Sequence, residues 1–352
     1  MNYKKISPSV FASAKKRISA IVAVRGKTTF PKNVKTVCAF PFISSVAVNG
    51  GFEDVLALSL LPSVSTISSV EEFSLDNNVA KGKGSSVFFE DVAENVFSRF
   101  SVAVLDSGVN YHLDLSSFKN RVINRVSFSE STLSDENGHG TMIAGLVGGN
   151  GLVSGGRFRG ISPGSNVVSV KCMRKDGKGD SVDILKGMQW IYDNARRYSI
   201  KVVAMAFGAP YQGAFDPLVR GVEALYKKGL IVVTASGNDP SDGVKSPGVS
   251  PYALTVGAYD SLSKTYARAS FSAKDELLKK PEFLLPGVNV CAPSISGEYG
   301  VFSGTSVSCG VGAGIVAALC EKVQNPTFTR LKALLKSASH GEKDYERYLM
   351  ID

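Results

Sequence analysis

Three side chains in this sequence have the types and the surroundings that nucleophilic catalysis needs. Asp106 follows an apolar run, His139 lies between two glycines, and Ser306 follows a Gly-Thr pair at the start of a run of small residues. A serine hydroxyl becomes a nucleophile when a histidine takes its proton and a carboxylate orients that histidine. These residues therefore supply the acid, base and nucleophile of a serine hydrolase, in the chain order Asp, His, Ser.

Each of the three also has a purely structural interpretation. Asp106 beside a Ser-Gly pair is typical of a turn that ends a strand, and Ser306 is suited to cap a helix. The base is better defined, because the chain contains only three histidines. His112 is expected at the surface of a loop and His340 in a polar tail, which leaves His139. The catalytic interpretation therefore depends on all three residues occurring together.

A fourth residue supports the same chemistry. The apolar run at 230–235 ends in Ser-Gly-Asn, and the amide of Asn238 can donate a hydrogen bond to the oxygen of a tetrahedral intermediate. The backbone N–H of Ser306, near the N-terminus of its helix, is a second donor. Alone, Asn238 would be interpreted as a turn residue. Beside the other three, it is the candidate oxyanion donor.

The elements that must position these side chains are alternating strands and helices. From residue 100 onward, apolar runs of strand length alternate with helical patterns, which indicates a parallel sheet covered by helices. Such sheets build their sites at the carboxyl ends of the strands. The expected strands are 102–105, 167–170, 202–206, 230–235 and 254–256. The expected helices are 141–147, 181–198, 217–228 and 306–323.

The first 75 residues are predicted to form a separate small α+β unit. Strands are expected at 18–24, 42–48 and 64–70, with a helix at 52–61. The stretch 76–95 contains Gly, Ser, Asn and charged residues that cannot bury a core, so it is expected to be a linker or processing region. The larger unit is expected to span 96–340, followed by a C-terminal tail at 341–352.

With these motifs and elements, the chain resembles the subtilisin-like serine proteases, or subtilases (peptidase S8 type), from about residue 100 to 337. Further ordered matches occur at 171–188, 202–210, 270–272 and 292–293. The resemblance implies an α/β, three-layer subtilisin-like fold with a mostly parallel central sheet, preceded by a small α+β propeptide-like domain. It also implies a serine endopeptidase that works through an acyl-enzyme. Asp106, His139 and Ser306 would form its triad. Asn238 would be the oxyanion donor.

The resemblance also implies where a peptide or protein substrate binds. An extended peptide would add as a strand between two edges of a groove. These edges would be Lys178, Gly179 and Asp180 on one side and Ala206, Phe207 and Gly208 on the other. Lys245 would lie at the floor of the first specificity pocket and favour an acidic side chain before the scissile bond. The alternative for Lys245 is an exposed loop lysine.

The N-terminal unit resembles a subtilase propeptide, which assists folding and inhibits the enzyme within the same chain. Autoprocessing is then expected between about residues 73 and 86. The alternative is a catalytically weak or silent subtilase-fold binding protein, held by its own prodomain. The chain departs from the family pattern at Met142, Ala206 and Gly310. These departures remove no triad member but leave the subsite geometry open.

Composition bounds the cofactors, partners and location. The proposed chemistry needs no cofactor. The family resemblance implies that Asp114 could bind a structural calcium ion, which stays an alternative. The glycine-rich stretch 148–160 does not have the ligand pattern of a calcium-binding loop. The net charge is +9, but the basic residues are dispersed, so no nucleic-acid partner is expected. No apolar run has transmembrane length. Five scattered cysteines indicate free thiols and a cytoplasmic location, with secretion as the alternative.

Overall fold

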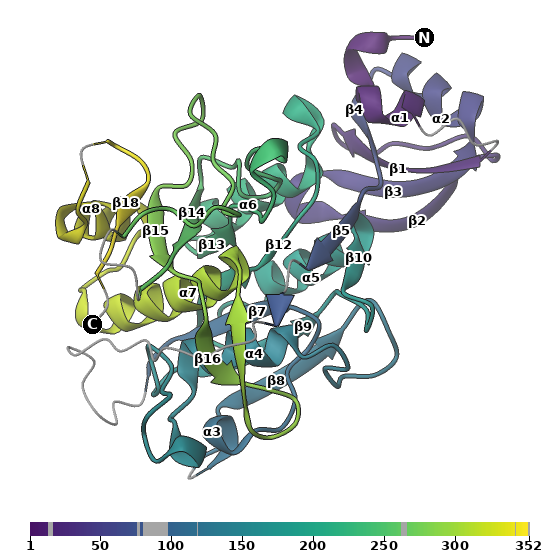
Figure 1. Ribbon diagram of the computed structural model, residues 1–352. Helices are drawn as coiled ribbons and strands as arrows, with labels where there is room; N and C mark the ends of the chain where they lie inside the picture. The colour runs from purple at the N-terminus through teal and green to yellow at the C-terminus, as the bar shows by residue number, and fades with distance from the viewer. Residues whose placement is uncertain are drawn as a thin grey trace.

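The computed structural model describes residues 1–12, 17–75, 78–79, 98–117, 119–261, 266–341 and 343–350. An eight-stranded sheet with the order β18-β15-β14-β13-β11-β7-β9-β8 forms the centre of the larger unit, and every neighbouring pair is parallel (Figure 1). The strands are β7 (Ser101–Asp106), β8 (Val122–Ser127), β9 (Asn166–Lys171), β11 (Ile200–Met205), β13 (Ile231–Ala235), β14 (Ala253–Tyr259), β15 (Phe283–Pro286) and β18 (Arg347–Tyr348). The expected mostly parallel sheet is confirmed.

Helices cover both faces of this sheet, which makes three layers. Because side chains alternate along a strand, β7 sends Val102 and Val104 to one face and Ala103 and Leu105 to the other. The first pair packs with α4 (His139–Gly148), α7 (Thr305–Lys322) and α8 (Phe328–Ala338). The second pair packs with α5 (Ser181–Asn194) and α6 (Pro217–Lys227). Burial on both faces explains why the strands are continuous apolar runs.

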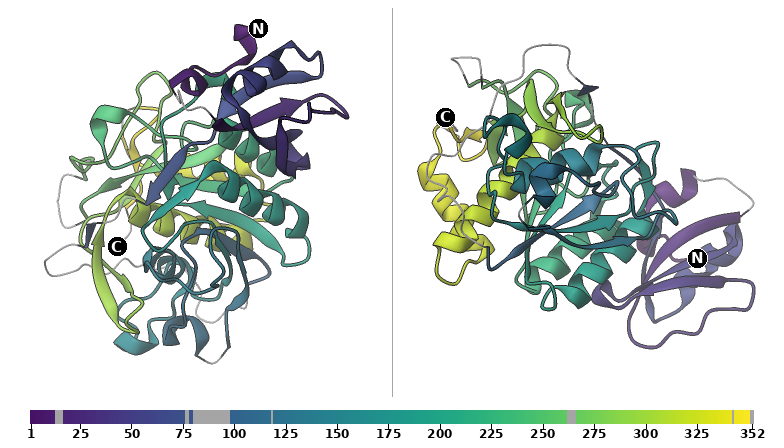
Figure 2. Two further views of the ribbon diagram at one scale, coloured as in Figure 1. Left: turned by 90° about the vertical axis from the view of Figure 1, so that its right-hand side faces the viewer. Right: turned by 90° about the horizontal axis from the view of Figure 1, so that it is seen from below.

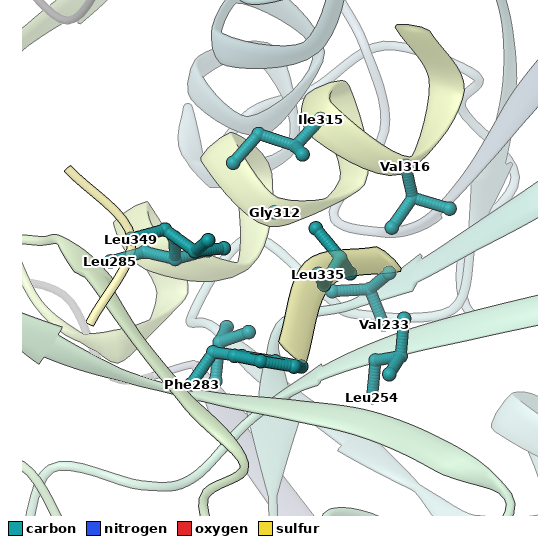
Figure 3. Close-up of a pocket in the computed structure, with 10 residues that line it drawn as sticks. Val233, Leu254, Phe283, Leu285, Gly312, Ile315, Val316, Leu335 and Leu349 are labelled. Atoms are coloured by element: carbon teal, nitrogen blue, oxygen red, sulfur yellow. The ribbon is translucent and has the colours of Figure 1, made fainter. Parts of the chain in front are cut away.

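Helix α7 crosses the interior, and its small residues allow close packing. A Cβ atom on Gly310 would lie 3.0 Å from the side chain of Leu146, and one on Gly314 would lie 2.7 Å from Ile161. Figure 3 shows Gly312, between these two glycines, where α7 meets β-strand side chains and Leu335 of α8 in an apolar contact region. The close contacts fix α7, and with it Ser306 at its N-terminus, against the sheet.

The N-terminal unit is a four-stranded antiparallel sheet with the order β2-β3-β1-β4. Its strands are β1 (Arg17–Val24), β2 (Lys35–Phe40), β3 (Ser45–Gly51) and β4 (Val64–Ser69), and its helices are α1 (Pro8–Ala12) and α2 (Phe52–Ala57). This unit lies to one side of the larger one (Figures 1 and 2). The strand expected at 42–48 is wrong in its first part, because residues from Pro41 to Ile43 form a 3₁₀ turn before β3.

Several elements of the larger unit lie outside the sequence prediction. Strand β8 and helix α8 carry many half-exposed or polar residues, so their apolar patterns are weak. Strand β18 has only two residues and adds to the edge of the central sheet beside β15, so part of the stretch expected to be a tail belongs to the sheet. A short helix, α3 (Leu113–Ser116), follows β7. Among the described residues, no helix is long and apolar enough to cross a membrane.

Two small sheets connect the units. Strand β5 (Glu72–Leu75), directly after the N-terminal unit, lies between β10 (Lys178–Asp180) and β12 (Phe207–Gly208). Strand β6 (Asn78–Val79) pairs with β17 (Tyr299–Ser303), which in turn pairs with β16 (Val290–Pro293). Figure 1 shows β5 leaving the N-terminal unit and running onto the larger one. These pairings bring the N-terminal part of the chain to the edge of the sheet where Asp106 lies.

Candidate active site

Asp106 and His139 form a buried pair at the carboxyl edge of the sheet. Asp106 ends β7, and His139 is the first residue of α4. The Nδ1 atom of His139 lies 2.8 Å from both carboxylate oxygens of Asp106. The His139 side chain is 0% exposed and that of Asp106 is 1% exposed. Water therefore competes little for this contact, which fixes the imidazole ring in one orientation.

Glycines allow the two elements to approach this closely. A Cβ atom on Gly140 would lie 2.0 Å from the carbonyl oxygen of Gly108, so only glycine fits beside the turn that follows Asp106. Gly108 itself has φ +114°, a conformation that favours glycine. The sequence around His139 is therefore explained by the approach of α4 to the end of β7.

Ser306 lies in the first turn of α7, which packs against α4 and β11. Its Oγ donates a hydrogen bond to the carbonyl oxygen of Ala206, 3.1 Å away. Ala206 directly follows β11, whose register pairs Ala204 with Val104 of β7, two residues before Asp106. In the described part of the chain, Nε2 of His139 has no hydrogen-bond partner. A serine–histidine hydrogen bond often forms only with substrate bound.

Asn238 is fixed to the residue that precedes Ser306. Its Oδ1 accepts hydrogen bonds from the backbone N–H and from the hydroxyl of Thr305, both at 2.8 Å. The Thr305 hydroxyl also accepts a hydrogen bond from the N–H of Gly237 at 3.2 Å. With Oδ1 held as the acceptor, Nδ2 is the donor end of the amide. The Gly-Thr-Ser segment thus joins Asn238 to the start of α7.

Asp135 is a site residue that the sequence interpretation missed. Its carboxylate is buried and accepts hydrogen bonds from the Ser107 hydroxyl, at 2.8 Å, and from the backbone N–H groups of Asn137, Gly138 and Thr141. One carboxylate therefore holds the residue after Asp106 and residues on both sides of His139. A signal existed in the sequence, because Asp135 lies only four residues before the candidate base in a polar segment.

We expect Asp135→Asn to lower kcat of peptide hydrolysis about 100-fold, with a smaller change in KM. An amide at this position presents N–H groups to backbone N–H donors, so the start of α4 must shift, and small displacements of a catalytic group carry losses of this size. Steady-state kinetics on a peptide substrate measures both constants. Asp114→Asn is the control, because it changes another buried aspartate and is expected to lower the melting temperature but not kcat. Equal loss of kcat in both variants would show that Asp135 is only structural.

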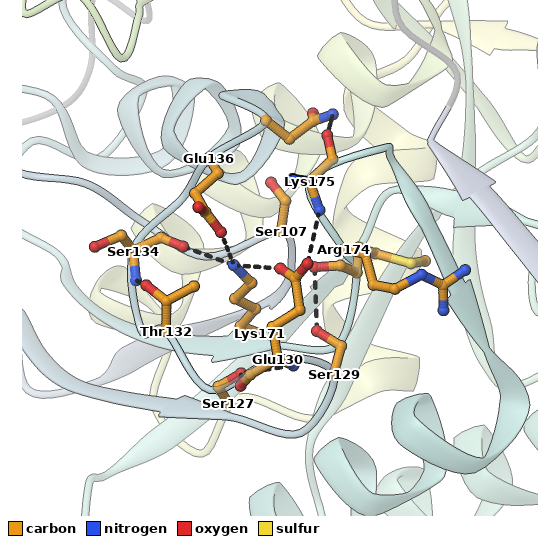
Figure 4. A network of polar contacts seen from close by, with 12 residues as sticks. Ser107, Ser127, Ser129, Glu130, Thr132, Ser134, Glu136, Lys171, Arg174 and Lys175 are labelled. Carbon is orange, nitrogen blue, oxygen red and sulfur yellow. Dashed lines mark hydrogen bonds and ion pairs between the residues drawn. The ribbon is translucent and has the colours of Figure 1, made fainter.

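Lys171 supports the loop that carries Asp135. It ends β9, pairs with Asp106 across the sheet and is fully buried. Its Nζ donates to the carbonyl oxygen of Ser134 at 2.8 Å and forms an ion pair with Glu130 at 2.9 Å (Figure 4). Burial by itself would raise the pKa of Glu130, but the hydrogen bond and charge of Lys171 hold that pKa below its usual value. This network stabilises the loop without contacting the candidate nucleophile.

The expected substrate edges are brought together, and the chain's own β5 lies between them. In β10, Lys178 pairs with Ser74, and the next two residues of β10 pair with the two residues that precede Ser74. In β12, Phe207 pairs with Leu75 and Gly208 with Ser74. The groove predicted to bind an extended peptide therefore binds an extended segment of this chain.

The expectation that His112 lies at the surface of a loop is wrong. His112 is buried, not at the surface, because its Nδ1 caps α3 by accepting from the N–H of Asp114 and its ring packs edge-on against Tyr299. His340 is exposed, as expected. Cys309, close to Ser306 in sequence, is buried, and its Sγ donates to the carbonyl oxygen of Val233 at 3.4 Å. Burial also raises its thiol pKa far above the usual value, so both observations favour a structural role.

The residues around Asp114 do not fit a calcium ion. One carboxylate oxygen of Asp114 accepts from the N–H of Val153 at 2.9 Å and the other from the phenol of Tyr299. Across the residues that the structure describes, no three His, Cys, Asp or Glu side chains cluster as metal ligands. Calcium binds through several oxygens at once, and protein donors hold both oxygens of this carboxylate.

Comparisons with known proteins decide the family. The profile described as "Subtilase family" matches residues 98–348. This chain belongs to the subtilase family. Serine protease AprX of Bacillus subtilis (strain 168) is 34% identical over 279 residues, which cover 69% of this subtilase and 62% of the relative. M-protease of Shouchella clausii (strain KSM-K16) is 30% identical over 309 residues, covering 86% and 76% respectively.

A third relative extends the comparison. Subtilisin-like protease 3 of Pseudogymnoascus destructans is 31% identical over 246 residues, which cover 67% of this subtilase and 56% of the relative. The aligned residues thus span less than two thirds of the length of AprX and of Subtilisin-like protease 3. The family match runs from just before β7 to β18, so it includes the whole central sheet. The expected subtilase resemblance is confirmed.

Proposed function

We propose that this subtilase is a serine endopeptidase in which Asp106, His139 and Ser306 form the catalytic triad. The observation that carries the proposal is the buried contact of His139 Nδ1 with both oxygens of Asp106, at 2.8 Å. The Ser306 hydroxyl, on the carbonyl of the neighbouring strand end, supports it. Relatives named serine protease and M-protease support the same reaction class.

The proposed reaction starts when a peptide carbonyl lies against the Ser306 hydroxyl. His139 takes the hydroxyl proton on Nε2 as Oγ attacks the carbonyl carbon, while Asp106 keeps the Nδ1–H tautomer in place. The Nδ2 group of Asn238 and the N–H of Ser306 stabilise the negative oxygen of the tetrahedral intermediate. The imidazolium then gives its proton to the leaving amine. Water hydrolyses the acyl-enzyme by the same steps and restores Ser306.

We propose that the N-terminal unit is the intramolecular inhibitor of this enzyme and a chaperone for its folding. Strand β5 fills the groove, and the backbone of Glu71 exchanges hydrogen bonds with Ser181 at the start of α5. The N–H of Phe42 donates to Gln189 at 3.1 Å, and Arg220 donates to the carbonyl oxygen of Ile43. The contact therefore extends from the groove along α5 and α6, which supports a docked domain rather than a single bound strand.

Labelling with a fluorophosphonate tests the proposed activity, because this reagent reacts with a serine that a histidine activates. We expect a covalent adduct on Ser306 in the full chain, and a stronger one in Phe73→Asp. The new charge would lie where Phe73 is buried against Phe207, so it would weaken the binding of β5 in the groove. Ser306→Ala and His139→Ala should remove the adduct. If neither the full chain nor Phe73→Asp is labelled, the alternative of a silent binding protein replaces the proposal.

We also propose a reducing, cytoplasmic location. The five cysteines are free thiols, three of them buried. Burial raises the thiol pKa of Cys320 to about 12, so this thiol resists oxidation. Free thiols are usual in reducing compartments. Fractionation of cells that produce the protein at its natural level would test this location, and recovery in the medium alone would contradict it.

A further inference from the structure

An open cavity of about 500 Å³ lies beside the turn that follows Asp106. None of the three candidate catalytic residues lines it. Its volume falls in the range of small-molecule sites, which combine apolar walls with a few placed polar groups. The cavity has this composition, because its lining includes Val109, Asn110, Tyr111, Arg125, Leu133 and Ile295.

Hydrogen bonds fix two walls of this cavity. The Asn110 side chain donates to the carbonyl oxygen of Asp135 at 2.7 Å and accepts from the Asp135 N–H at 2.9 Å. The carbonyl oxygen of Ser134, next to Leu133, accepts a hydrogen bond from the buried Lys171 at 2.8 Å (Figure 4). The cavity is therefore formed before a ligand enters, which lowers the entropic cost of binding.

Arg125 brings a positive charge to the cavity from the edge of the central sheet. In β8 it pairs with Ser169 of β9, two residues after Val167, which belongs to the same apolar cluster as α4. Side chains two apart in a strand point to the same face, so Arg125 points to the α4 side of the sheet. There its Nε donates to the carbonyl oxygen of Val109 at 3.1 Å. This hydrogen bond holds the guanidinium in the cavity wall.

The Arg125 guanidinium has no anionic partner in the part of the chain that the structure describes. Among those residues, its hydrogen bond goes to the backbone of Val109, which leaves the other N–H donors of the guanidinium without a protein acceptor. Burial lowers the pKa of Arg125 below its usual value, and no carboxylate opposes this effect. An arginine keeps its proton even so. A half-buried charge without a counterion is unfavourable, and a bound anion would relieve that cost.

The other walls and the charge balance define the ligand. Tyr111, Leu133 and Ile295 are exposed large hydrophobic residues, and apolar groups that gather at one surface site favour an apolar ligand. Arg125 is the only cation among the described residues that line the cavity, so charge balance favours an anion with a single negative charge. A carboxylate has one charge and two oxygens, which match the planar fork of a guanidinium. A phosphate dianion would keep an unbalanced charge.

We propose that this cavity is a binding site for a small carboxylate with an apolar or aromatic body. The carboxylate would pair with Arg125, and the body would pack on Leu133, Ile295 and the ring of Tyr111. Such binding does not depend on the proposed endopeptidase function, because none of the triad residues lines the cavity.

Ligand-observed NMR titrations of the full chain test this site with hexanoate, acetate, hexanamide and inorganic phosphate. We expect hexanoate to bind with a dissociation constant of about 1 mM. Acetate lacks most of the apolar body and hexanamide lacks the charge, so both should bind at least about 10-fold more weakly, as should phosphate. Equal binding of hexanamide would overturn the role of the charge, and equal binding of acetate or phosphate would overturn the role of the apolar walls. No binding of hexanoate would overturn the whole proposal.

Variants locate the binding at this cavity. Arg125→Gln should weaken hexanoate binding about 10- to 100-fold, the range that the loss of a charged hydrogen-bond donor supports. Arg157→Gln is the matched control, because it removes the same charge from an exposed arginine that does not line the cavity. Hexanoate binding that survives Arg125→Gln, or that falls equally in Arg157→Gln, would overturn the assignment.

A second variant keeps the test decisive if Arg125→Gln does not fold, which circular dichroism would show. Leu133 is exposed, so Leu133→Ser should fold normally. It should weaken hexanoate binding about 3- to 10-fold by removing apolar contact and leave acetate binding unchanged. Hexanoate binding that is unchanged in Leu133→Ser would overturn the proposed position of the apolar body.

Discussion

Replacing Ser306 with alanine is expected to lower kcat for peptide hydrolysis about 10⁶-fold, the order of loss typical of a subtilisin without its nucleophile. The physical reason is that Oγ is the atom that bonds to the carbonyl carbon, and the neighbouring Thr305 hydroxyl is held by Asn238. Residual turnover would come from the oxyanion donors and substrate binding. The measurement is single-turnover hydrolysis of a quenched peptide, together with the mass of the full chain, which should stay unprocessed.

Ser308→Ala is the matched control for this prediction. Ser308 is also a buried serine of α7, and its hydroxyl donates to the carbonyl oxygens of Leu285 and Pro286, both at 3.2 Å. Its loss should destabilise the fold by about 1 kcal/mol and leave kcat within a few-fold. A second check is whether the losses of kcat add, because substitutions within one catalytic unit have effects on kcat that are not additive. His139→Ala combined with Ser306→Ala should be no slower than Ser306→Ala. Retention of activity in Ser306→Ala would refute the triad.

Asp106→Asn should lower kcat about 10⁴-fold, which is the order of loss that follows when a triad carboxylate becomes an amide. Both oxygens of Asp106 lie 2.8 Å from Nδ1 of His139. An asparagine there can donate its own N–H to Nδ1, which moves the imidazole proton to Nε2 and removes the lone pair that must accept the serine proton. Steady-state kinetics should show the loss in kcat, with KM almost unchanged.

The control for Asp106→Asn is Asp183→Asn. Asp183 lies on α5 and pairs with Lys186 at 2.8 Å, so its charge is part of a local helix contact. This variant should keep full activity. Circular dichroism of both variants checks that the central sheet is intact. If Asp106→Asn is folded and its kcat falls less than tenfold, the Asp106–His139 contact has a structural role and the assignment of the acid is incorrect.

The parts of the fold that sequence predicted are those in which burial is strongest. Strands such as β7 and β13 are buried on both faces and therefore appear as continuous apolar runs. The candidate triad could be found because its members follow such runs or open helices with distinctive small residues. Edge elements were harder, since β8 and α8 meet solvent and carry mixed patterns. A two-residue strand such as β18 has no pattern of its own.

Residues whose roles depend on distant partners could not be predicted in the same way. Asp135 becomes a positioning residue only because β7 and α4 meet at its carboxylate. His112 looked like a loop histidine, and its burial depends on Tyr299, which is far away in the sequence. In each case the missing information was a long-range contact rather than a local propensity.

The position of β5 in the groove has a kinetic consequence for the intact chain. A segment tethered to its own binding site competes at an effective concentration that is often millimolar for a short link, and this value does not change when the protein is diluted. External substrates would therefore be excluded equally in a crowded or a dilute solution. Hydrolysis of one bond would convert this tethered ligand into a separate molecule, and the fraction of that molecule bound in the groove would fall with dilution. The start of proteolysis would then be irreversible, and the fraction of active enzyme would depend on the protein concentration.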